Sequence, residues 1–457
     1  MRLAILVLGF MLLAATASAA TLLVNPDGSG DQPTLWAAML AASDGDVIEL
    51  GDGVFTGDGN RDFLYFRAVT LRSQSGNAAN CVIDPQGSAG DPHRAFTVAG
   101  GGAGSRIENI TFRNGYADGV SVVETTGACI LCTQGAAPTI SGCRFESSYA
   151  GRIGGGVGLD YSGEVTLVDC VFSGLEALED GAGVGGAGGG AALVDCWFTG
   201  CDTSFNGGFC VFLSEYDLDF TYSIEDCDFV GNACGGVYTQ GGAELRRCRF
   251  EELGYTGAWL SAAYGDVDLA EDCVFRACTG GSALSLGRRG GAGGPNEEIV
   301  VRRCLFYENV SDEPTLSMGG LLSHLHDLTF WNNDSPGAMG FPGGLEHVMT
   351  VLVERVIVAG GTSSEAVVCG DGMLDLTIRC SDFHGGWDGC AADWLGVDGN
   401  IDADPMFCDA AAGDFTLHAS SPCFEVNNGC GTMGAYDVGC GTTGVEDSSF
   451  GAIKALY

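Results

Sequence analysis

Lysine is almost absent from this chain: Lys454 is the only one among 457 residues, and all basic side chains together number 20 against 59 acidic ones. Nucleic acids and anionic lipids are bound through clustered basic residues, so a formal net charge of −39 argues against both as partners. Charged residues are scarce at 17%, whereas hydrophobic residues make up 46%. That share is too high for a disordered acidic chain and predicts a large core.

Long hydrophobic runs are missing except at the start. Met1 and Arg2 precede an apolar run from Leu3 to Leu13, and Ala17-Ser18-Ala19 is a small-residue cleavage pattern. The run is shorter than the roughly 20 residues of a membrane span, so residues 1–20 are predicted to be a secretory signal peptide rather than an anchor. No later segment is apolar enough to span. We expect a secreted protein, extracellular or on the outer cell surface, where disulfides form.

A repeat of the form aliphatic-x-x-Cys-x-Phe fills the middle of the chain. Its cysteines are Cys143, Cys170, Cys196, Cys227, Cys248, Cys273 and Cys304. Successive repeat phenylalanines, from Phe112 to Phe330, are separated by 21 to 33 residues. Between them, Gly-rich turns precede a second short apolar segment, as at Gly155 to Leu159. Two short strands in each repeat of this length predict a parallel β-solenoid whose turns stack directly on one another.

The alternatives fit less well. A β-propeller needs roughly 40 residues and four strands in each blade, which is longer than these repeats. Leucine-rich repeats have a similar period but need a Leu/Asn pattern that this chain lacks. In the solenoid, Cys and Phe lie two residues apart on one strand face, so both point into the bore. We interpret the thiols as buried small hydrophobes rather than as a metal or redox site, because burial makes a thiol unreactive.

On this repeat the chain resembles the right-handed parallel β-helix proteins of the pectin-lyase-like superfamily, and its repeats are also similar to those of polymorphic outer-membrane proteins. The segment from Asn25 to Leu50 is similar to the start of many such chains. The resemblance implies an all-β, single-stranded right-handed parallel β-helix over roughly residues 21 to 440. It also implies that polysaccharide lyases are relatives in which carboxylates hold calcium and an arginine takes the sugar proton.

We divide the chain accordingly. Residues 21–60 form an N-terminal cap in which Thr34 to Ala42 is a helix that covers the open end of the coil. Residues 61–386 form the β-helix. Residues 387–440 form a second cap, held by disulfides among Cys390, Cys408, Cys423, Cys430 and Cys440. Residues 441–457 are a linker with a possible sorting tail.

The residue before each repeat cysteine gives the candidate binding column. Its members are Asp169, Asp195, Asp226, Arg247 and Asp272, followed by Arg303, Asp327 and Arg355. Where the signs alternate, neighbouring residues should pair on the outer wall. Asp169, Asp195 and Asp226 have no basic neighbour between them and could hold Ca²⁺ through carboxylate oxygens. Melting curves with calcium and with a chelator test this site, and identical midpoints would exclude calcium binding there.

The leading functional hypothesis is a non-catalytic binding, adhesive or structural role toward glycans or another cell surface. Aromatic side chains suited to stacking on sugar rings are Trp197, Tyr216, Tyr238 and Trp259. The alternative is a polysaccharide lyase or glycoside hydrolase that acts on an extracellular acidic polysaccharide. No catalytic residue can be assigned, and no cofactor other than Ca²⁺ is suggested. A wall without a polar pocket favours binding, and a groove with converging carboxylates favours the enzyme.

Overall fold

The computed structural model describes residues 19–100, 104–205, 207–214, 222–261, 267–287, 298–343 and 347–441. The predicted signal peptide before residue 19 and the predicted tail after residue 441 lie outside the described residues. Within those ranges, no helix combines the length and the apolar character that a membrane crossing requires.

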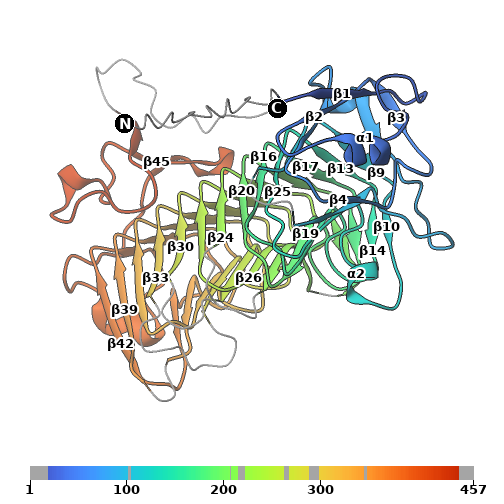
Figure 1. The fold of residues 1–457 in the computed structure, drawn as a ribbon. Helices are drawn as coiled ribbons and strands as arrows, with labels where there is room; N and C mark the ends of the chain where they lie inside the picture. Colours follow the sequence, from blue (N-terminus) through green and yellow to red (C-terminus); the bar gives the residue numbers. More distant parts are fainter. Residues whose placement is uncertain are drawn as a thin grey trace, which may run out of the picture.

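The chain winds into a long coil, and each turn adds one strand to each of three parallel sheets (Figure 1). We call them sheets A, B and C, in the order in which the chain passes from A to B and then to C, and we call each turn a rung. Short strands between B and C form a fourth sheet, the corner sheet. Pairing in all four is parallel and in sequence order, so the predicted single-stranded β-solenoid is confirmed.

Sheet A contains β1 (Thr21–Val24), β2 (Val47–Leu50), β5 (Thr70–Ser73), β8 (Arg106–Glu108), β12 (Thr139–Ser141), β16 (Val165–Val168), β20 (Ala191–Val194), β24 (Tyr222–Glu225), β27 (Ala243–Arg246), β30 (Val267–Glu271), β33 (Glu298–Arg302), β36 (Leu322–His326), β39 (Met349–Glu354) and β42 (Leu374–Arg379). Sheet B contains β3 (Gly53–Phe55), β6 (Cys81–Ile83), β9 (Thr111–Arg113), β13 (Arg144–Glu146), β17 (Val171–Ser173), β21 (Trp197–Thr199), β25 (Asp228–Val230), β28 (Arg249–Glu251), β31 (Val274–Arg276), β34 (Leu305–Tyr307), β37 (Thr329–Trp331), β40 (Ile357–Ala359) and β43 (Asp382–Phe383).

Sheet C contains β4 (Phe63–Tyr65), β7 (Phe96–Ala99), β11 (Ile130–Thr133), β15 (Val157–Asp160), β19 (Val184–Ala187), β23 (Phe209–Ser214), β26 (Gly235–Gln240), β29 (Ala258–Ser261), β32 (Leu284–Leu286), β35 (Leu316–Met318), β38 (Met339–Phe341) and β41 (Val367–Cys369). The corner sheet contains β10 (Tyr116–Ala117), β14 (Tyr149–Ala150), β18 (Glu176–Ala177) and β22 (Asp202–Thr203). The helices are α1 (Leu35–Ala41), α2 (Val122–Thr125) and the 3-10 turns η1 (Ala78–Asn80), η2 (Gly389–Trp394), η3 (Ala410–Ala412) and η4 (Glu425–Asn427).

The bore is filled by the two predicted columns. From Phe145 to Phe330, successive repeat phenylalanine rings are stacked with centroids 4.5–5.0 Å apart and planes within 8° of parallel. All seven repeat cysteines are buried and free. Burial raises the pKa of the Cys143 thiol to about 12, as expected of a buried and unreactive thiol.

The thiols also satisfy carbonyl groups at the turn from sheet A to sheet B. Cys170 Sγ donates to the Val168 carbonyl at 3.4 Å and lies 3.5 Å from the Ile140 carbonyl of the adjacent rung. Ser381 holds the same position in the last rung, and its hydroxyl donates to the Arg379 carbonyl at 3.0 Å. These bonds are additional ones, since the Val168 carbonyl already accepts the Gly142 N–H at 2.9 Å.

The N-terminal end is closed by α1, as predicted. Thr34 is its N-cap and accepts a hydrogen bond from the Ala37 N–H at 3.2 Å. Leu35, Ala38 and Met39 face the same core as the first rungs. The helix thus supplies the apolar surface that a neighbouring rung would otherwise provide.

The C-terminal cysteine-rich segment has two parts. Trp387 and Ala391 join the main core at the end of the coil, and disulfides link Cys369 to Cys390 and Cys380 to Cys430. A third disulfide joins Cys408 to Cys440, in a small sheet of β44 (Phe407–Asp409), β45 (Asp414–His418) and β46 (Val438–Cys440). Cys423 remains a free, buried thiol, and only Cys408 and Cys440 pair within the predicted set. Cys390 and Cys430 instead pair with Cys369 and Cys380, which lie before the predicted cap.

The small sheet does not extend the coil but lies along the outer face of sheet B (Figure 1). The Phe415 ring centroid is 5.0 Å from that of Tyr307, and Phe407 meets Trp331 edge-on at 5.6 Å. The Ala435 N–H donates to Thr329 Oγ1 at 2.9 Å. This part of the cap therefore covers the side of the last rungs rather than their end.

We expect the phenylalanine stack to dominate stability. Replacing the fully buried Phe229 with alanine should lower the free energy of unfolding by roughly 3–5 kcal/mol, because it leaves a cavity between two rings. Chemical denaturation followed by far-UV circular dichroism measures the loss. Phe205→Ala is the control, since that ring is 67% exposed. Equal midpoints for the two variants would contradict the role of the stack.

A buried carboxyl in the C-terminal cap should make stability depend on pH. Burial raises the pKa of Asp382 to about 6, although the Ala403 N–H and the Cys423 thiol both donate to it. Because the folded pKa lies above the unfolded value, this group's stabilising contribution is full below about pH 4 and is lost as the pH rises through about 6.

Asp382→Asn should therefore gain stability relative to the natural protein as the pH rises from about 4 to 7, by at most roughly 3 kcal/mol. Thermal melts at several pH values measure this difference. Asp393→Asn, an exposed change in η2, should leave the pH profile unaltered. If the stabilities of the natural protein and of Asp382→Asn change with pH in the same way, the ionisation of Asp382 does not control the pH dependence.

Candidate functional site

The predicted outer column stacks in register at the turn from sheet A to sheet B. Asp169, Asp195, Asp226, Arg247 and Asp272 all have φ between 51° and 56°, the left-handed region that lets one residue turn the chain. Each backbone N–H donates to a carbonyl of the next rung at 2.9–3.2 Å. All five residues are exposed, so the column forms an outer edge of the coil.

Where the signs alternate, the predicted pairs form. Arg247 binds Asp226 through two hydrogen bonds of 2.7 and 2.8 Å, and Arg303 binds Asp272 through bonds of 2.7 and 3.1 Å. Asp226 raises the pKa of the Arg247 guanidinium. Each exposed pair contributes at most about 1 kcal/mol to the stability of the fold, so this part of the column has a minor structural role.

The calcium hypothesis rests on the other part of the column. Asp169 and Asp195 stack on adjacent rungs, whereas both oxygens of Asp226 are engaged by Arg247. The described residues contain no cluster of three or more His, Cys, Asp or Glu side chains placed to hold a metal ion. Calcium binding at Asp169 and Asp195 therefore stays a prediction for the melting experiment.

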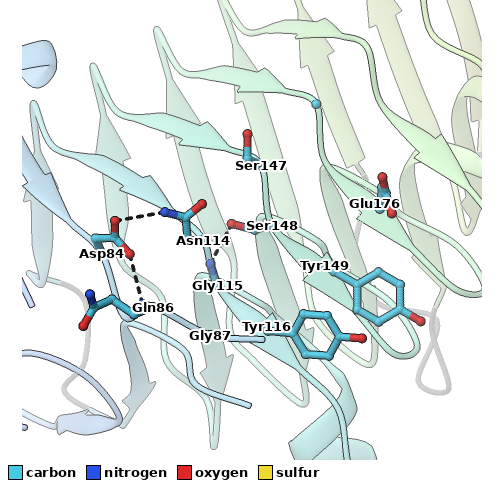
Figure 2. A pocket seen from close by; sticks show the side chains of 11 residues that line it. Asp84, Gln86, Gly87, Asn114, Gly115, Tyr116, Ser147, Ser148, Tyr149 and Glu176 are labelled. Carbon is cyan, nitrogen blue, oxygen red and sulfur yellow. Dashed lines mark hydrogen bonds between the residues drawn. The ribbon is translucent and has the colours of Figure 1, made fainter. Parts of the chain in front are cut away.

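A polar groove lies elsewhere, on the corner between sheets B and C (Figure 2). Its volume is about 600 Å³. We call it the tyrosine groove. Its lining residues are Asp84, Gln86, Gly87, Asn114, Gly115, Tyr116, Ser147, Ser148, Tyr149, Gly174 and Glu176. None of them belongs to the predicted column, so this polar groove was not found from the sequence.

The corner sheet builds one wall of this groove. Its register places Tyr116, Tyr149, Glu176 and Asp202 in one outward column, while the small residue after each of them points inward. The two half-buried tyrosine rings lie 4.7 Å apart at 27° and point the same way (Figure 2). The outer column therefore consists of two stacked tyrosine rings, followed on the next two rungs by the carboxylates of Glu176 and Asp202.

The opposite wall is held by Asp84, whose side chain is almost fully buried. One oxygen accepts the Gln86 N–H at 3.0 Å, and the other accepts Asn114 Nδ2 at 2.9 Å and Arg113 Nε at 3.0 Å. These bonds hold Asp84 as a fixed acceptor. Glu176, in contrast, is exposed at the far side of the groove (Figure 2).

The groove carries negative charge. Asp84 and Glu176 are the only charged residues in the lining given above, which includes no Lys, Arg or His. Burial raises the pKa of Tyr116 and of Tyr149, and the carboxylates of Asp118 and Glu176 raise both further. The phenols therefore stay protonated and neutral as hydrogen-bond donors.

A signal for this site does exist in the sequence. Tyr116, Tyr149, Glu176 and Asp202 each follow a repeat phenylalanine by four residues. The type of residue changes along this column, so no repeated motif marks it. Of the aromatic residues proposed for sugar stacking, Tyr238 and Trp259 lie on sheet C, Trp197 lies on sheet B, and Tyr216 falls outside the described residues.

Comparison with known proteins concerns the fold. The catalytic domain of a GH87 alpha-1,3-glucanase is 10% identical, with 78% of this chain and 64% of that chain covered at a TM-score of 0.49. A PL6 polysaccharide lyase from Pseudopedobacter saltans is 11% identical over 74% of this chain and 90% of that chain, with a TM-score of 0.42. A surface adhesin of Streptococcus pneumoniae is 11% identical over 73% and 91%, with a TM-score of 0.33.

No curated protein matches the sequence. The profile of the family described as "Right handed beta helix region" matches residues 67–289, which include the rungs that carry the tyrosine groove. This match and the parallel rungs of sheets A, B and C show that the chain folds as a right-handed parallel β-helix.

Proposed function

We propose that this protein is exported and binds a glycan, without cleaving it, in the tyrosine groove. The observation that carries the proposal is the stacked pair of Tyr116 and Tyr149 beside the polar floor of the groove. Aromatic faces pack against the C–H face of a sugar ring, and nearby polar groups hydrogen-bond to its hydroxyls. Export is supported by the three disulfides near the C-terminus.

The groove favours a neutral sugar chain. Ser147 and the amide of Gln86 offer both donors and acceptors to hydroxyl groups, and the Glu176 carboxylate is a strong acceptor. Arg113 pairs with Asp84, but the lining offers no basic residue that would offset the charge of Glu176 against the carboxylates of an acidic polysaccharide. We therefore expect neutral oligosaccharides to bind more tightly than acidic ones.

The rival function is glycan cleavage, and one observation favours it. Two carboxylates, Asp84 and Glu176, line the same groove, and paired carboxylates are the catalytic groups of most glycoside hydrolases. Three donors fix Asp84 as an acceptor, which suits positioning a ligand better than donating a proton. Incubation with neutral and acidic polysaccharides, followed by assays for reducing ends and unsaturated products, separates the two functions. Turnover that Glu176→Gln abolishes would overturn the binding proposal.

We predict that Tyr149→Ala weakens binding of neutral oligosaccharides about tenfold or more, because it removes one of the two stacked tyrosine rings. Isothermal titration calorimetry against a panel of neutral and acidic oligosaccharides measures the change. Tyr161→Ala is the matched control, since Tyr161 is 62% exposed and lies outside the groove. Equal losses in both variants, or no loss in Tyr149→Ala, would place the binding surface elsewhere.

A further inference from the structure

A second run of aromatic side chains lies on the outer face of sheet C, well along the coil from the tyrosine groove. The register places Phe212, Tyr238 and Trp259 on successive rungs of β23, β26 and β29. The rings of Phe212 and Tyr238 are stacked at 5.1 Å and 10°, and Trp259 meets Tyr238 edge-on at 5.7 Å. All three side chains are half-buried.

This run stops abruptly at Trp259. The next two rungs place Ser285 and Ser317 in the same outward column. The change from indole to hydroxymethyl leaves a cavity of about 200 Å³ against the side of Trp259. We call it the indole cavity. Its other lining residues are Tyr255, Thr256, Leu286, Gly287, Glu313, Met318, Gly319 and Pro342.

Tyr255 and Glu313 face this cavity from rungs that are two steps apart. The rung between them carries Gly280, Gly281 and Ser282, so no bulky side chain fills the space. A Cβ at Gly281 would lie only 2.4 Å from Thr256 Oγ1, which keeps that position a glycine. Two rungs correspond to roughly 10 Å, which is wide enough for one small ring.

Glu313 supplies the only charge among the residues that line the cavity. The side chain is exposed, and its backbone N–H is held by Ser311 Oγ at 2.9 Å. Ser282 Oγ lies 3.4 Å from Oε2, and no other side-chain partner of this carboxylate is recorded within the described part of the chain. Glu313 thus offers an anionic acceptor in the lining of the cavity that Trp259 also lines.

We propose that the indole cavity binds a sugar residue that carries a free, protonated amino group; this rests on the proposed glycan-binding function and names the class of sugar at a second site. The faces of Trp259 and Tyr255 pack against the ring and attract a nearby cation. The hydroxyls of Ser285 and Ser317 bind sugar hydroxyls. The ammonium group pairs with Glu313, and the net charge of −39 draws cationic ligands to this protein.

An N-acetylated sugar tests this assignment directly, since acetylation removes the positive charge and leaves the ring. The full mature chain is titrated with glucosamine oligomers and with N-acetylglucosamine oligomers of equal length, at mildly acidic pH where the amine is protonated. We expect the amine form to bind about tenfold more tightly, because hydrogen bonds to charged groups are the stronger ones.

Glu313→Gln should remove this preference and bring the two affinities close together. Asp312→Asn is the matched control, because it removes the same charge from the neighbouring exposed residue outside the cavity. Trp259→Phe should weaken the binding of both oligomers and leave the ratio of their two affinities unchanged. Equal affinity of the natural protein for the two oligomers would overturn the proposal, as would a preference that survives in Glu313→Gln.

Two further measurements separate this site from the tyrosine groove. If Tyr149→Ala leaves the amine preference intact, the indole cavity acts independently, as proposed. If neutral oligosaccharides fail to bind while the preference and its loss in Glu313→Gln persist, the proposed function of the tyrosine groove fails and this inference stands. If Tyr149→Ala removes the preference, the amino sugar binds in the tyrosine groove and this inference is wrong.

Discussion

From β8 onward, one residue in the left-handed region follows each strand of sheet A and turns the chain toward sheet B, and the regular part of the coil depends on that turn. At Asp169 or Asp195 its N–H bonds to the neighbouring rung, while the cysteine that follows points its thiol inward. The thiol then takes up carbonyl groups of its own rung and of the adjacent one. Because this turn has the same length from β8 onward, the phenylalanine two residues after the cysteine position reaches the same place in the bore in successive rungs.

The same register extends to the outer surface, where it builds both candidate sites. Tyr116 and Tyr149 lie side by side because their rungs are in register, as do Trp259 and Ser285. A hollow forms where a column changes from a large to a small side chain, and the strands hold its walls fixed. Ligand binding on such a surface orders few side chains, which lowers its entropic cost.

Periodic features of this protein could be predicted from the sequence, and features that occur once or twice could not. The cysteine, phenylalanine and aspartate columns recur often enough to define a rung, and all three were found in the structure. Tyr116 and Tyr149 form a column of only two tyrosines, and Asp84 reaches the groove from an earlier rung whose corner has a different length. Phe407 and Phe415 pack on sheet B through contacts with Trp331 and Tyr307 that no spacing reveals, so this segment was expected only as a cap.

The distribution of charge also bears on what this surface recognises. The few arginines are largely engaged by carboxylates of adjacent rungs, as Arg247 is by Asp226, Arg303 by Asp272 and Arg355 by Asp327. A guanidinium group that is already paired with a carboxylate is less available to an anionic ligand. The acidic excess meanwhile stays at the surface, where Glu176 and Glu313 lie at the two hollows. Both proposals therefore share one expectation, that acidic glycans bind less tightly at these hollows than neutral or amine-bearing ones.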